Sequence, residues 1–203
     1  ATRVPTSAAA RVVAVASSFL YTEPYKIEDA TTPEMYFGRR SARRQIMETR
    51  TGLIFGGRRL GKSSIIADIC RKESSPPQKK FYLHVELNQH MVEEKYEEEV
   101  WRLIAQALRT HNVVSSPNIQ FTNGNPKFVL DTLKKAFQDD KITHLTLYLD
   151  EADRFMHLEE KSNFKVLYDF TTELSHRFPD RFSYAISGLN NVQRVSLGWN
   201  TRL

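Results

Sequence analysis

Short apolar runs alternate with longer amphipathic stretches along most of this chain, and the apolar runs predict strands. Each run is nearly continuous in apolar character rather than strictly alternating with polar positions. That pattern is typical of parallel strands that are covered on both faces. The predicted strands lie at residues 51–55, 81–87, 144–149 and 182–189.

Helices are predicted where apolar positions recur every three or four residues. One such stretch precedes the first strand, and the others lie between strands. The predicted helices lie at residues 40–50, 64–72, 92–111, 126–139 and 162–178. Strands that alternate with helices predict an α/β fold, in which a parallel sheet lies between two layers of helices.

Two regions of the chain differ in pattern and predict its domain organisation. Residues 1–32 contain scattered Pro and Thr with little periodicity, and we interpret them as an N-terminal arm or linker. Residues 33–203 contain the predicted strands and helices and form the predicted core domain. The chain does not begin with Met and stops shortly after the last predicted strand, so we expect a fragment that ends before a lid domain.

The composition indicates the cellular compartment of the protein, and its charged residues are unevenly distributed along the chain. The chain is 40% hydrophobic and 26% charged, values typical of globular domains. Cys70 is the single cysteine, and no apolar stretch is long enough to span a bilayer, so we expect a cytoplasmic protein without membrane contact.

Residues 1–80 hold 15 Lys and Arg against 7 Asp and Glu, whereas residues 81–203 hold 14 against 17. This basic excess indicates a solvated surface beside an anionic ligand, with nucleic-acid binding as the alternative.

The most specific chemical signal is a glycine-rich segment, residues 56–63, which reads GGRRLGKS between a predicted strand and a predicted helix. Glycine permits backbone at positive φ and lets amides approach phosphate oxygens closely. The following helix adds unpaired N–H groups and the positive end of its dipole. Lys62 is expected to contact the β- and γ-phosphates, and the Ser63 hydroxyl to ligate Mg²⁺. The expected nucleotide-binding residues are Gly56, Gly57, Arg58, Arg59, Leu60, Gly61, Lys62, Ser63 and Ser64.

An acidic pair follows the apolar run at residues 144–149. Asp150 and Glu151 would lie at the carboxyl edge of a parallel sheet, where open α/β sheets bind ligands. We expect Asp150 to hold Mg²⁺ together with Ser63, and Glu151 to orient and deprotonate the attacking water. An acidic pair after an apolar run is also common at a solvated strand end. Its position downstream of an intact phosphate loop favours the catalytic reading, the Walker B pattern.

The last predicted strand ends in small and polar residues. Ser187 or Asn190 would therefore lie near the γ-phosphate, where either could act as a polar sensor. A Ser-Gly-Leu-Asn turn without a ligand role is the alternative.

These segments, in this order, resemble one group of ATPases. They are residues 36–39 (YFGR), 57–64 (GRRLGKSS), 149–153 (LDEAD) and 187–194 (SGLNNVQR). The chain is similar over residues 33–195 to AAA+-like ATPases of the STAND signalling class and to their initiator-type relatives of the Orc class. The resemblance implies a P-loop NTPase core of the ASCE type, with three α/β/α layers. It also implies that the sensor strand lies between the phosphate-loop strand and the Asp150 strand.

The resemblance further implies roles for residues outside the two main motifs. Phe37 and Arg39 would line the adenine pocket, and Arg194 matches a trailing arginine that reaches phosphate, with a surface ion pair as the alternative. Arg177 and Arg181 stand where relatives place an arginine that acts on a neighbouring subunit, with a solvated loop arginine as the alternative. Arg40 replaces the acidic residue that is usual after the segment at 36–39.

The function expected from these features is an ATP-driven switch. ATP with Mg²⁺ would hold one conformation, hydrolysis to ADP would release it, and either self-association or other modules of a longer chain would respond. One alternative is a DNA-associated ATPase, for example an initiator, a loader or a transposition-type protein. Another is a nucleotide-binding scaffold without turnover. A small-molecule kinase is disfavoured because the acidic pair suits water as the acceptor.

Overall fold

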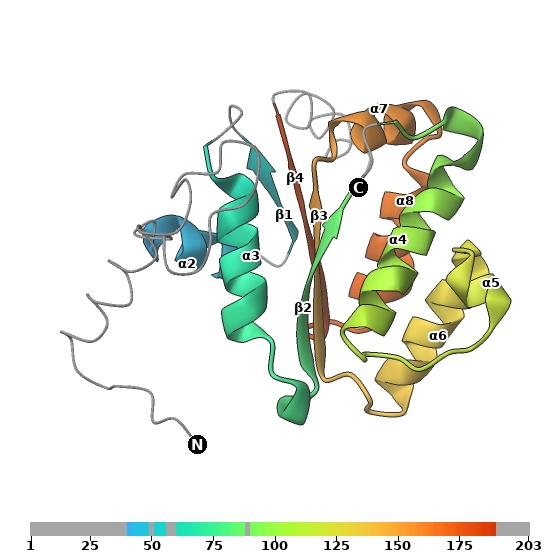
Figure 1. Ribbon diagram of the computed structural model, residues 1–203, viewed down its shortest axis with the longest axis horizontal. Helices are drawn as coiled ribbons and strands as arrows, with labels where there is room; N and C mark the ends of the chain where they lie inside the picture. Colours follow the sequence, from blue (N-terminus) through green and yellow to red (C-terminus); the bar gives the residue numbers. More distant parts are fainter. Residues whose placement is uncertain (1–39, 49–50, 56–59, 88–89, 190–203) are drawn as a thin grey trace, which may run out of the picture.

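The computed structural model describes residues 40–48, 51–55, 60–87 and 90–189 of the 203-residue chain. Four strands form one parallel sheet in the order β1-β4-β3-β2 (Figure 1). They are β1 (Thr51–Phe55), β2 (Lys80–Glu86), β3 (His144–Asp150) and β4 (Phe182–Gly188). The predicted strands and the parallel sheet are confirmed. So is the expected order, because β4 lies between β1 and β3.

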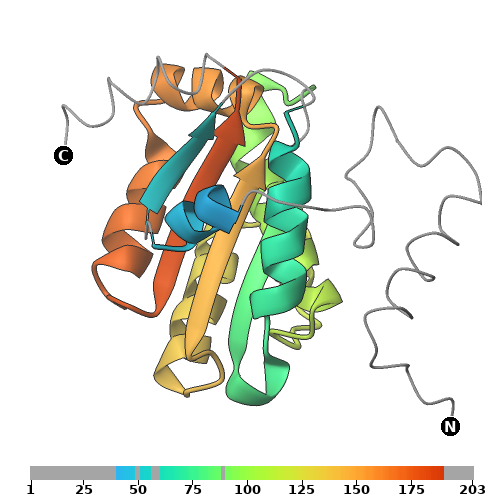
Figure 2. The same cartoon turned by 90° about the vertical axis from the view of Figure 1, so that its left-hand side faces the viewer.

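Helices cover both faces of the sheet. On one face lie α2 (Arg40–Glu48) and α3 (Lys62–Glu73), and Figure 2 shows α2 lying across the sheet beside α3. On the other face lie α4 (Tyr96–Thr110), α5 (Ile119–Thr122), α6 (Pro126–Gln138) and α8 (Lys165–Tyr168) (Figure 1). Helix α7 (Asp153–Lys161) lies at the end of the sheet where the strands finish. The three-layer α/β/α architecture is that predicted from the alternation of strands and helices.

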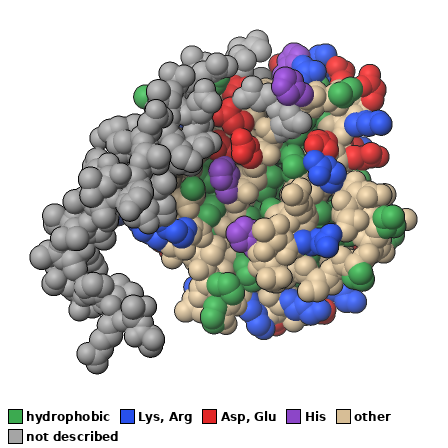
Figure 3. Space-filling view, viewed as in Figure 1, with side chains coloured by type: hydrophobic (Ala, Val, Ile, Leu, Met, Phe, Trp, Pro, Cys, Tyr) green, Lys and Arg blue, Asp and Glu red, His purple; other side chains and the backbone are tan. Residues whose placement is uncertain are grey.

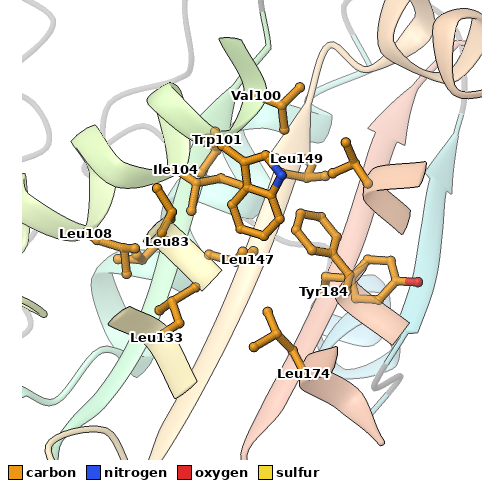
Figure 4. Close-up of a cluster of buried hydrophobic side chains, with 14 of the residues drawn as sticks. Leu83, Val100, Trp101, Ile104, Leu108, Leu133, Leu147, Leu149, Leu174 and Tyr184 are labelled. Atoms are coloured by element: carbon orange, nitrogen blue, oxygen red, sulfur yellow. The ribbon is translucent and has the colours of Figure 1, made fainter. Parts of the chain in front are cut away.

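Two hydrophobic cores hold these layers together, and they differ greatly in size. The larger core fills the face under α4, α6 and α8, around the fully buried Trp101 (Figure 4). The ring of Phe170 packs edge-on against Trp101, with centroids 5.4 Å apart. The smaller core, between the sheet and α2–α3, consists of Ile65, Ile66, Ile69, Tyr148 and Ala185 and partly buried neighbours.

The predicted helix at 162–178 begins three residues too early, and helix α7, which precedes it, was not predicted. Helix α7 occupies Asp153–Lys161, and the chain then turns through Asn163 and Phe164, whose φ angles are positive at 62° and 60°. Helix α8 starts at Lys165 and runs into a π-helical segment, Asp169–Ser175. The turn is stabilised because the buried carboxylate of Glu159 accepts hydrogen bonds from the first amides of the new helix.

Smaller differences occur in two other segments. The predicted helix at 92–111 begins as a 3-10 turn, Glu93–Lys95, and α4 proper starts at Tyr96. Short helix α5 interrupts the stretch between α4 and α6, because Asn118 caps it by accepting a hydrogen bond from the Gln120 amide. None of the described helices is long and apolar enough to cross a membrane. The predicted boundary near residue 33 lies outside the described residues and stays a prediction.

Candidate active site

The last residues of the four strands lie at one edge of the sheet. In register, Glu86 of β2 lies beside Asp150 of β3, and Phe55 of β1 lies beside Gly188 of β4. Since the strands are parallel, their carboxyl ends meet there, next to the N-terminus of α3. Figure 3 shows acidic side chains toward this end of the sheet, with histidines both there and farther down the same face.

The N-terminus of α3 follows directly from the sequence of the phosphate loop. Gly61 precedes the helix with φ of 74°, a left-handed conformation that favours glycine. Its carbonyl oxygen accepts the first helical hydrogen bond, 3.1 Å from the Ile65 nitrogen. Lys62 and Ser63 therefore form the first turn of α3, and Ser64 is buried in the same turn. The first amides of this turn are the groups that an anion would contact.

Asp150 is the centre of the polar contacts at this edge. Its side chain is almost fully buried, and its Oδ2 lies 3.0 Å from Nε2 of His84 on β2. Its Oδ1 accepts a hydrogen bond from the Glu151 backbone amide at 3.0 Å. Burial alone would raise the pKa of Asp150, but hydrogen bonding to His84, Ser63 and Ser187 outweighs it and lowers the pKa to about 2. Asp150 is therefore a carboxylate at neutral pH.

Ser187 reaches the same carboxylate from β4. Its hydroxyl helps to lower the pKa of Asp150, yet its Oγ is fully buried and forms no well-aligned hydrogen bond with the described residues. A buried hydroxyl without a formed hydrogen bond is uncommon and costs free energy unless a ligand supplies a partner.

Glu151 follows Asp150 in a strained backbone conformation. Its φ angle is 54°, in the left-handed region, which costs a residue other than glycine roughly 1–2 kcal/mol. The neighbouring hydrogen bonds hold this turn in place. The Ala152 amide donates to the Ser187 carbonyl at 2.9 Å, and the Leu189 amide donates to Asp153 Oδ2 at 2.8 Å. Such local strain is typical of functional sites.

These groups suit a hard cation. The oxygens gathered here are the charged carboxylate of Asp150 and the hydroxyls of Ser63 and Ser187, and Mg²⁺ prefers oxygen ligands. The incomplete bonding of Ser187 leaves a buried oxygen available. The chemistry of this donor set therefore fits Mg²⁺.

An apolar hollow of about 370 Å³ opens beside the phosphate loop. Ala42 and Ile46 of α2 line one side, and Leu53 and Phe55 of β1 line another. Leu60 and Lys62, at the start of α3, also line the hollow, and Gln45 supplies a polar group. Phe55 and Leu60 are about half exposed, at 49% and 52%, which is unusual for large apolar side chains and leaves the hollow accessible.

The structure brings together part of the predicted site. Ser63 and Ser187 both help to lower the pKa of the Asp150 carboxyl, and the Glu151 amide donates to the same carboxylate. Other predicted residues lie outside the described part of the chain, and their roles stay predictions. They are Phe37, Arg39, Gly56, Gly57, Arg58, Arg59, Asn190 and Arg194.

Two further residues at this edge were not predicted. His84 contacts Asp150 from β2, and Asp153 accepts the Leu189 amide. No motif marks His84, and only the register of β2 against β3 would have placed it beside the acidic pair. Arg181, by contrast, lies at the other end of β4, where it donates to the Phe137 carbonyl at 2.9 Å and pairs with Asp140.

Comparison with known proteins supports the fold and leaves the family open. No protein-family model matches the sequence, and no curated protein matches it. A solved structure, the Walker-type ATPase of Pyrococcus abyssi, superposes with a TM-score of 0.56 at 14% sequence identity. The match covers 84% of this chain and 51% of that chain, so this chain spans about half the length of that protein. The fold is therefore that of a P-loop NTPase core.

Proposed function

We propose that this chain binds ATP with Mg²⁺ and hydrolyses it, acting as the nucleotide switch of a STAND or AAA+-type signalling or assembly protein. One observation carries the proposal: Ser63, in the first turn of α3, helps by hydrogen bonding to lower the pKa of the buried Asp150 carboxylate, although the two residues are 87 positions apart in the sequence. A convergence of loop and carboxylate is what a nucleotide–magnesium complex requires. The Walker-type ATPase with a similar fold is consistent with this chemistry.

The phosphate groups would lie over residues 56–63 and the N-terminus of α3. Backbone amides of the loop donate to phosphate oxygens, and the helix dipole favours their negative charge. Lys62 contributes a positive charge at the β- and γ-phosphates. Ser63 and Asp150 hold Mg²⁺, which when bound neutralises charge that develops on the phosphates.

Glu151 acts on the attacking water. Its position directly after Asp150 places a second carboxyl group beside the γ-phosphate, where it orients the water and accepts its proton. Either Ser187 or Asn190 after it contacts the γ-phosphate as a polar sensor. In this arrangement the buried Ser187 hydroxyl finds the partner that the described residues do not supply.

The base of the nucleotide would occupy the apolar hollow between α2, β1 and α3. Its apolar walls suit the faces of adenine, and Gln45 can bond to a base edge. Phe37 and Arg39, just before α2, would complete this pocket. Binding there ties α2 to the nucleotide, so that hydrolysis changes what holds α2 in place and the rest of a longer chain, or a second copy, can respond.

The proposal is tested by comparing ATP hydrolysis in the parent chain, Glu151→Gln and Glu160→Gln. Glu160 is an exposed residue of α7 and serves as the matched control. We expect Glu151→Gln to bind ATP normally and to hydrolyse it roughly 10²- to 10⁴-fold more slowly, the usual contribution of a general base. The control should hydrolyse ATP at the parent rate. Equal, negligible hydrolysis by all three, with ATP bound, would instead identify a nucleotide-binding scaffold.

A DNA-associated ATPase is the second candidate, favoured by the basic excess in residues 1–80. DNA affinity would then fall steeply with salt, because each phosphate contact releases counterions. Fluorescence anisotropy of labelled duplex and single-stranded DNA from 50 to 200 mM salt tests it. Absence of binding at the lowest salt would exclude this candidate.

A further inference from the structure

His84 is placed beside the acidic pair by the register of two strands. It pairs with Tyr148 in the β2–β3 ladder, two positions before Glu86 pairs with Asp150. Because alternate residues of a strand point to the same face, His84 and Asp150 both project toward the α3 face. The next strand position on the opposite face, Val85, is buried in the larger core.

The contact between His84 and Asp150 has a defined direction. Nε2 of His84 lies 3.0 Å from Oδ2 of Asp150. An ionised carboxylate only accepts hydrogen bonds, so the imidazole carries its proton on Nε2 and donates. Oδ1 of the same carboxylate is held by the Glu151 amide at 3.0 Å. Both oxygens are thus fixed, and the plane of the carboxylate cannot rotate without breaking one of the two bonds.

His84 is not needed to fill a core. Its side chain is 27% exposed, and it lies on the edge strand of the sheet. Each carboxylate oxygen has two acceptor sites, so one hydrogen bond from His84 leaves capacity on Oδ2 for a cation or its water shell. Partners that orient a metal-ligating carboxylate in this way commonly set metal affinity.

We propose that His84 is a positioning residue, which holds Oδ2 of Asp150 so that the carboxylate faces the Mg²⁺ of the bound nucleotide. The inference rests on the proposed nucleotide–magnesium site and adds to it a residue from β2. It also makes the edge strand β2 a contributor to the site, alongside α3, β3 and β4.

The test compares His84→Ala, His84→Gln and the control His144→Ala. Glutamine can present an N–H at about the reach of Nε2, whereas alanine cannot. His144 is a partly buried histidine of β3 at the opposite end of the sheet, bonded to Thr146 and to the Asp180 carbonyl. Affinity for a fluorescent ATP analogue is measured in EDTA and in Mg²⁺, and Mn²⁺ binding to the nucleotide complex is followed by electron paramagnetic resonance.

We expect His84→Ala to weaken Mg²⁺ and Mn²⁺ affinity roughly 10- to 100-fold, the usual effect of losing such a partner. Analogue affinity in EDTA should stay at the parent value. His84→Gln should recover most of the metal affinity, and the control should behave as the parent. Metal affinity of His84→Ala within twofold of the parent, an equal loss in EDTA, or no recovery in His84→Gln would each overturn the inference.

The same data separate this inference from the proposed function. If the parent chain binds the analogue and gains affinity with Mg²⁺, the nucleotide site is supported whatever His84→Ala does. If the parent chain binds no analogue in either condition, the proposed function fails, and the role of His84 fails with it.

Discussion

Glu159 is an acidic residue whose side chain is fully buried from solvent. It is a residue of α7, and its carboxylate accepts hydrogen bonds from the Tyr96 hydroxyl at 2.8 Å and the Leu167 amide at 2.8 Å. Burial raises the pKa of Glu159 to about 7, and these hydrogen bonds offset only part of the rise. The same carboxylate accepts hydrogen bonds from the first amides of α8 and so stabilises the turn before this helix. Its burial disfavours the charged form of the side chain.

This raised pKa predicts a pH-dependent stability. Between the ordinary value of 4.5 and about 7, the folded state binds more protons than the unfolded state. The free energy of unfolding should therefore fall as pH rises through this window, by on the order of 3 kcal/mol, and level off above it. Urea unfolding from pH 4.5 to 8 measures the slope, which Glu159→Gln should flatten. Glu160→Gln, the exposed neighbour, should keep the parent slope, and equal slopes in all three would contradict the prediction.

At the scale of elements, the turn between α5 and α6 lies directly against the backbone of α4. Gly124 in this turn has φ of 75°. A Cβ atom built there would lie under 3.0 Å from the Glu98 carbonyl oxygen and the Arg102 nitrogen, which are backbone atoms that cannot move aside. The close approach thus depends on the absence of a side chain.

Gly124→Ala should separate this turn from α4. Overpacking costs about 1–3 kcal/mol and the left-handed conformation about 1–2 kcal/mol more, so we expect a loss of roughly 2–5 kcal/mol in the free energy of unfolding. Chemical denaturation followed by circular dichroism measures it. Asn123→Ala, at an exposed neighbour with ordinary backbone angles, should cost under about 1 kcal/mol. Equal stability of the two variants would show that the turn adapts.

For the whole molecule, nucleotide binding and unfolding are linked. A ligand that binds only the folded state raises its stability by about 2.7 kcal/mol at 100 times its dissociation constant. ATP with Mg²⁺ should therefore raise the thermal midpoint of the parent chain, as differential scanning fluorimetry would detect. Lys62→Ala should abolish the shift, and Lys127→Ala, an exposed lysine of α6, should keep it. If ATP with Mg²⁺ raised the thermal midpoint of Lys62→Ala as much as that of the parent chain, Lys62 would not contribute to nucleotide binding.

The fold was predictable because its signals are local and repeated. Apolar runs marked all four strands, and the segment at 56–63 marked the strand-to-helix turn. The break at Asn163 and Phe164 was not predictable, because it depends on Glu159 reaching amides seven and eight residues onward in a folded core. The contact of His84 with Asp150 could not be predicted from the sequence either, because it depends on the register of β2 against β3 and not on neighbouring residues.

The hydrophobic cores on the two sides of the sheet differ in size, so the two helical layers differ in their resistance to local unfolding. Helices α2 and α3 rest on a small apolar layer, whereas α4, α6 and α8 share the large one around Trp101. Local opening costs less where fewer apolar side chains are exposed by it, so amide hydrogens of α2 and α3 will exchange with solvent before those of α4. The layer that carries the phosphate loop is thus the one most easily tightened or loosened by what occupies it.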